Sequence, residues 1–174
     1  MFNFINLDEK TRQHMLEAIS EAEVSGNIYF STRFNDAGYK QWLPLLKEAA
    51  QEQNEHWLAY QLEAKGLMKG FEGAMTPSGG YTVKHTPDTA AETMAEGQFN
   101  RFYMLGLCKR ARTEGISQLE IYRAKTSSAP RMQSEALIGT KILIDDIESQ
   151  LVKTADSFKS SLVKPNSGIS VKLP

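Results

Sequence analysis

A carboxylate and an amide lie in the middle of an apolar helix face, where neither can remain without a partner. Residues 86–113 are expected to form a long helix, which a capping box opens. At about 100° per residue, Glu96 and Asn100 lie on the same side of this helix as the apolar residues Phe99, Tyr103, Leu107 and Ala111. An unpaired buried polar group costs roughly a few kcal/mol, and an unpaired buried charge costs more. Glu96 and Asn100 therefore need a partner in this chain, in another chain or in a ligand.

The next element along the chain offers such a partner. Residues 118–124 are expected to form a strand that places Arg123 on the same face as Leu119 and Ile121. A guanidinium group can bind a carboxylate through two parallel hydrogen bonds. We therefore predict a structural polar core in which Glu96 pairs with Arg123 and Asn100 bonds nearby. The opposite side of the long helix carries Gln98, Arg101, Lys109 and Arg112, and is expected to face solvent.

The same residues allow a catalytic alternative. A small enzyme acting on nucleic acid or nucleotides would use Glu96 and Glu120 as its carboxylates, with Arg123 and Arg131 on phosphate. Strand alternation weakens this hypothesis, because it places Glu120 on the face opposite Arg123. The net charge of −1 and the pI near 6.3 weaken it further, since nucleic-acid binders usually carry a basic excess. A nucleic-acid partner is left open but not favoured.

Other catalytic and metal-binding patterns are missing from the sequence. The three histidines, His14, His56 and His85, are widely separated, and the single Cys108 excludes an internal disulfide or a Cys-based zinc site. Residues 66–80 contain five glycines but match neither the P-loop nor the dinucleotide fingerprint, and are expected to form a mobile loop. We therefore expect no catalytic residue, no metal and no cofactor.

Composition and periodicity indicate an α+β fold. The chain of 174 residues is 41% hydrophobic and 24% charged, as is ordinary for one globular domain. No segment reaches the apolar length of a membrane span, and residues 1–7 do not resemble a signal peptide, so we expect synthesis in a cytoplasm without a membrane anchor. The predicted helices are 8–23, 39–51, 54–65, 86–113 and 145–153, and the predicted strands are 27–33, 81–85 and 118–124. The prediction is a mainly helical single domain with a small β-sheet, in residues 1–163.

The C-terminal residues differ in pattern from the rest. Residues 164–168 have the composition of a flexible hinge, and Ile169, Val171 and Leu173 then alternate with polar residues as in a strand. A lone strand needs a sheet edge, either in its own domain or in a neighbouring subunit, and otherwise frays. We predict that residues 164–174 form an extended, flexible arm that packs on an adjacent protein.

Five short segments of the chain are distinctive when taken together. The segments are EGQFNRFY at 96–103, EIYRAK at 120–125, Pro130-Arg131, SEALIG at 134–139 and PNSG at 165–168. As a set they resemble proteins encoded in tailed-bacteriophage and prophage gene clusters, some of them virion structural proteins. The resemblance implies a non-enzymatic structural or assembly protein of the head or neck. It would be made in the cytoplasm of a bacterial host and located in the virion.

The resemblance also implies partners and an interface. The partners would be copies of this chain and other virion proteins. The residues expected to hold such an interface are Arg101, Arg131, Ile169, Val171 and Leu173. Protomers of this kind assemble symmetrically, so each contact would recur around a ring or shell.

Overall fold

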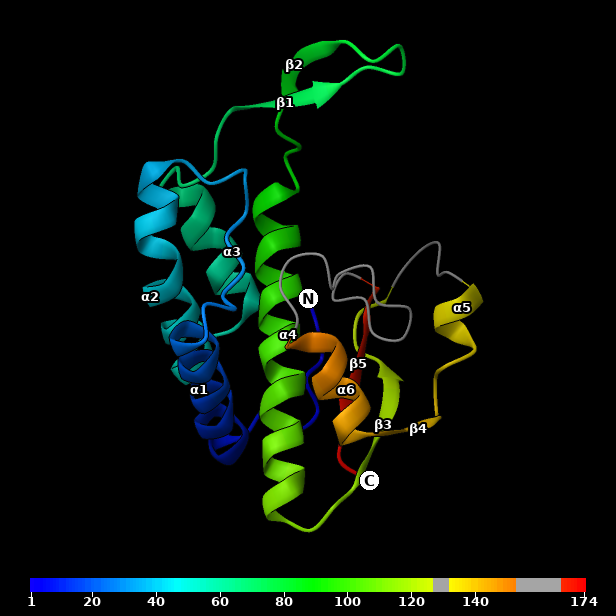
Figure 1. The fold of residues 1–174 in the computed structure, drawn as a ribbon. Coiled ribbons are helices and arrows are strands. Elements are labelled where there is room, and N and C mark those ends of the chain that lie inside the picture. Colours follow the sequence, from blue (N-terminus) through cyan, green and yellow to red (C-terminus); the bar gives the residue numbers. More distant parts are fainter. Residues whose placement is uncertain (127–131, 153–166) are drawn as a thin grey trace.

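The computed structural model describes residues 1–126, 132–152 and 167–174 (Figure 1), and the predicted α+β, mainly helical fold is confirmed. The elements in chain order are α1 (Glu9–Val24), α2 (Asp36–Glu52), α3 (Glu55–Ala64), β1 (Phe71–Met75), β2 (Tyr81–His85), α4 (Ala90–Thr113), β3 (Gln118–Arg123), α5 (Met132–Glu135), β4 (Lys141–Leu143), α6 (Ile144–Leu151) and β5 (Ile169–Lys172). None of the helices in these residues is both long enough and apolar enough to cross a membrane.

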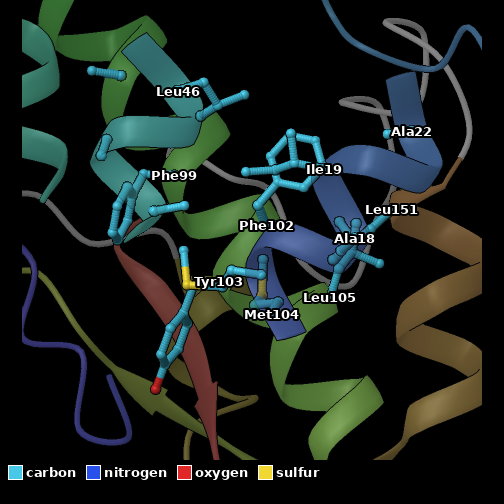
Figure 2. Close-up of a cluster of buried hydrophobic side chains, with 14 of the residues drawn as sticks. Ala18, Ile19, Ala22, Leu46, Phe99, Phe102, Tyr103, Met104, Leu105 and Leu151 are labelled. Carbon is cyan, nitrogen blue, oxygen red and sulfur yellow. The ribbon is translucent and has the colours of Figure 1, made fainter. Parts of the chain in front are cut away.

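The helix α4 runs through the middle of the molecule. The three helices α1, α2 and α3 pack along one side of it, and α6 with the strands β3 and β5 covers the other (Figure 1). Figure 2 shows the resulting core, in which Phe99, Phe102 and Tyr103 of α4 lie among side chains from the surrounding helices. Because α4 is covered from several directions, the polar residues Gln98, Asn100 and Arg101 in its middle are buried as well as the apolar ones.

The first three helices begin at the polar residues that favour a helix start. The side chains of Asp8, Asn35 and Asn54 accept hydrogen bonds from backbone N–H groups in the first turns of α1, α2 and α3. The N-cap predicted at Asp8 is thereby confirmed. The segment 27–33, predicted as a strand, forms no regular element. The next residue, Phe34, forms an isolated antiparallel bridge with Met68.

The strands form two separate antiparallel sheets. One has the order β4-β3-β5, and the other contains only β1 and β2. In the first, Ile121 pairs with Val171 and Arg123 with Ile169, so the C-terminal residues join the domain's own sheet. The backbone just before β5 lies close to the backbone just after β3 at Gly168, which has a φ of 73°. A Cβ added to Gly168 would lie 2.8 Å from the carbonyl oxygen of Lys125.

This pairing corrects the prediction for the C-terminal arm. The segment is extended, as expected, but Ile169 and Val171 are almost completely buried in the core, and Leu173 packs against it. Their side chains therefore stabilise their own domain instead of packing on a neighbouring protein. A sheet edge was available in the same chain, and two apolar side chains gain more there than in water. Residues 164–166 of the expected hinge lie outside the described residues.

The close contact between α1 and α4 depends on Gly106. A Cβ added there would lie 2.7 Å from Cγ and 2.9 Å from the backbone nitrogen of Met15. The backbone of α1 cannot shift by that amount without disturbing the core, which is packed as tightly as an organic crystal.

We predict that Gly106→Ala destabilises the protein by roughly 1–3 kcal/mol, because α1 must move away from α4. Helix propensity alone predicts the opposite sign, since alanine favours a helix over glycine by about 1 kcal/mol. Urea unfolding measures the change. The matched control is Gly70→Ala, where the added Cβ has open space around it. A Gly106→Ala protein as stable as wild type would contradict this account.

Candidate functional site

Glu96, the carboxylate on the central helix, has a different partner from the one predicted. Its Oε1 accepts a hydrogen bond from the Lys125 ammonium at 2.5 Å, and the same ammonium lies 3.0 Å from Glu92. Arg123 instead pairs with Glu135 and donates to the backbone oxygen of Ser167 at 3.0 Å. The predicted Glu96–Arg123 pair is therefore wrong. The chain continues past β3, and Lys125 reaches the carboxylate from just beyond the strand.

The two carboxylates that share Lys125 have opposite pKa shifts. Burial raises the pKa of Glu96 above its usual value of 4.5, and the negative charge of Glu92 adds to the rise. The more exposed Glu92 has a lowered pKa, mainly because Lys125 donates a hydrogen bond to it. The arrangement is a partly buried ionic cluster that connects α4 to the segment after β3.

Asn100 connects α4 to the C-terminal strand. Its side-chain nitrogen donates to the backbone oxygen of Ile169 at 3.0 Å, and its side-chain oxygen accepts from the hydroxyl of Ser170 at 2.6 Å. Asn100 and Ser170 are both completely buried. The amide that needed a partner therefore finds it in β5, and its role is structural.

Arg101 is buried, although the sequence placed it on a solvent-facing side and in an interface. Only 4% of it is exposed, because α6 and the residues after α1 cover this side of α4. Its guanidinium donates to the backbone oxygens of Leu151 at 2.8 Å and Asn27 at 3.2 Å, and to the side-chain oxygen of Gln98 at 3.3 Å. Gln98 is buried too. Of the other predicted interface residues, Arg131 lies outside the described residues.

Among the residues of the catalytic alternative that the structure describes, Glu96, Glu120 and Arg123 each pair with a different residue. Glu120 forms an ion pair of 3.0 Å with Lys172 of β5, whereas Glu96 pairs with Lys125. In the described part of the chain, no group of three or more histidine, cysteine, aspartate or glutamate residues could hold a metal ion. Cys108 is buried, and burial raises the pKa of its thiol, whereas reactive cysteines have a lowered pKa.

The most unusual surface is the β1–β2 hairpin, which projects from the end of the helical body (Figure 1). Strand register divides its side chains between two faces. The polar face contains Glu72, which pairs with Arg33 at 2.5 Å and with Lys84 at 3.1 Å. The hydrogen bonds from Arg33 and, to a smaller extent, from Lys84 lower the pKa of Glu72 to about 2. The ion pair with Arg33 fixes the hairpin to the body.

The other face of the hairpin is apolar and open to solvent. Its large side chains are Phe71 (57% exposed), Met75 (69%), Tyr81 (84%) and Val83 (72%). The ring of His85 contacts that of Phe71 in a tilted arrangement, with ring centroids 4.4 Å apart. We call this the apolar hairpin face. A cluster of large apolar side chains on a projecting element is typical of an interaction site.

The sequence predicted only one of the two strands of this hairpin. It predicted β2, but treated the glycine-rich residues 66–80 as a mobile loop, whereas β1 forms within them. The available signal was period-two alternation, with Phe71 and Met75 on one side and Glu72 on the other, followed by a turn at residues 76–80.

The shared lysine cluster gives a pH-dependent prediction. A carboxyl group with a raised pKa binds a proton more tightly in the folded state, so its contribution to stability falls as pH rises from about 4.5 through its folded pKa. Glutamine does not titrate, so Glu96→Gln removes this pH-dependent loss of stability. Its free energy of unfolding, relative to wild type, should therefore rise with pH across this range in urea titrations.

Glu92→Gln is the matched control, with the opposite sign. Its lowered pKa stabilises the fold above that pKa, so the variant should lose stability relative to wild type as pH rises toward about 4.5. Identical pH profiles for the two variants would contradict the assignment.

Comparison of this chain with protein-family models, with curated proteins and with solved structures found no match.

Proposed function

We propose that this chain is a non-enzymatic structural or assembly protein of a tailed-phage virion, a component of the head or neck. In this proposal it binds neighbouring subunits through the apolar hairpin face. The observation that carries the proposal is this face itself, with four large apolar side chains more than half exposed on a projecting element. The sequence resemblance supplies the kind of particle.

The energetics of the hairpin favour such a role. An isolated two-stranded sheet is at best marginally stable in water, so a hairpin of this kind gains from a surface that covers it. Burial of one large apolar side chain contributes roughly 1.5–3 kcal/mol. The Arg33–Glu72 ion pair holds the base of the hairpin, which lowers the ordering cost when the apolar face is covered.

Symmetry would multiply this contribution. In a ring or shell of identical protomers, each hairpin contacts the next copy, and modest contacts add up over the assembly. The proposed partners are copies of this chain and other virion proteins, and the protein would be made in the host bacterial cytoplasm and carried in the virion. Nucleic acid is not favoured as a partner, because the net charge of −1 supplies no general attraction for phosphate.

The enzyme alternative receives less support from the geometry. Its carboxylates Glu96 and Glu120 have separate lysine partners, and Arg123 is paired with Glu135. A catalytic pair would instead converge on one substrate position.

We therefore expect no hydrolysis of nucleic acids or nucleotides by the purified protein with Mg²⁺ or Mn²⁺. The assay compares wild type with Glu96→Gln and Glu120→Gln. Reproducible metal-dependent turnover that either substitution abolishes would favour the enzyme over the assembly protein.

The proposal predicts self-association that depends on the hairpin. Wild type should form oligomers as its concentration is raised, and the double variant Met75→Ser, Tyr81→Ser should remain monomeric over the same range. Loss of two apolar side chains that the association would bury should weaken it by about a hundredfold or more. Sedimentation velocity measures the mass, and the thermal unfolding of the monomer should change little, since both side chains are exposed.

The matched control is Val24→Ser, Tyr60→Ser, which removes two exposed apolar side chains from helices outside the hairpin. It should associate like wild type. The proposal fails if wild type and the hairpin variant have the same mass at every concentration.

A further inference from the structure

A pocket unrelated to the hairpin lies where α1, α4 and α6 meet. Its volume is about 460 Å³, within the range of small-molecule sites. Ala18, Ala22 and Leu105 form an apolar wall, and Figure 2 shows their side chains where α1 packs on α4. Small side chains on α1 leave this space open.

Three cations from one stripe of α4 line the same pocket. They are Arg101, Lys109 and Arg112, which recur at the spacing of one helix face. Two of them have carboxylate partners: Lys109 pairs with Glu21 at 2.6 Å, and Arg112 pairs with Glu148 at 2.7 Å and with Asp145 at 2.8 Å. Among the described residues, one of the three cations is left without a carboxylate partner.

The unmatched cation is Arg101. It is the most deeply buried of the three, yet its acceptors are two backbone carbonyls and an amide oxygen. A guanidinium group has five N–H donors, so these three bonds leave donors available. The carbonyl of Leu151 lies at the end of α6 and offers only a partial negative charge. Burial without a carboxylate lowers the pKa of Arg101 to about 10.

We propose that this pocket binds a small organic anion, with a carboxylate or phosphate group among the three cations and a short apolar chain against Ala18, Ala22 and Leu105. A planar guanidinium group suits both kinds of oxyanion. The ligand would supply the charged oxygen acceptor that Arg101 lacks among the described residues, and its apolar part would cover the alanine and leucine side chains. This site is independent of the proposed assembly function.

The test is an NMR titration at constant ionic strength with hexanoate, hexyl phosphate and the uncharged hexanol. We expect saturable shifts at the backbone amides of Ala18, Ala22 and Lys109 with at least one of the two anions, and weaker binding of hexanol. The anion that binds more tightly identifies the head group as a carboxylate or a phosphate. No saturable binding of either anion, or hexanol binding as tightly as both, overturns the proposal.

Variants locate the site without altering Arg101, whose removal threatens the fold. Lys109→Gln and Arg112→Gln should each weaken anion binding by about tenfold, as expected for one charge-assisted hydrogen bond. Ala22→Leu should abolish binding by filling the pocket, with an unchanged helical circular dichroism spectrum. Lys40→Gln, at an exposed lysine of α2, is the matched control and should bind like wild type. Equal affinities in all five proteins overturn the proposal.

Discussion

The fold depends on burying one helix from several directions at once. The helix α4 has buried residues on every side along most of its 24 residues, including Gln98, Asn100 and Arg101. A helix on the surface of a domain needs only one apolar stripe, whereas a central helix must supply a hydrogen-bond partner for every polar group it buries. The placement of α1, α6 and β5 follows from that requirement. Gly106 sets how closely α1 can approach.

The polar groups of α4 are satisfied by segments far away in the sequence. Asn100 bonds to β5, Arg101 to the end of α6 and to the loop after α1, and Glu96 to Lys125. Each of these hydrogen bonds fixes the position of one segment against α4, which apolar contacts alone would leave less precisely defined. The polar interior thus fixes which segments surround the helix. The apolar hairpin face has no corresponding cover among the described residues.

Local signals in the sequence were enough for the longer helices, but not for the short α5 or for the surroundings of α4. Asp8 and the apolar spacing predicted α1, because a cap and a periodic face are properties of neighbouring residues. The exposure of Arg101 was predicted wrongly, since a helical wheel assumes one covered side and α4 has several. The partner of Glu96 was also wrong, because the choice between Arg123 and Lys125 depends on how β3 ends. Glycine content concealed β1, although Phe71, Glu72 and Met75 alternate as in a strand.

The Asn100 contact has a consequence for how the molecule folds. Its partners Ile169 and Ser170 lie 69 and 70 residues further along the chain. Until those residues arrive, the amide must keep its bonds to water, and the core around the middle of α4 cannot close over it. The helical body and the sheet should therefore form together in one cooperative transition. Contacts this distant in sequence also slow folding, because the loop between them must close before any bond is gained.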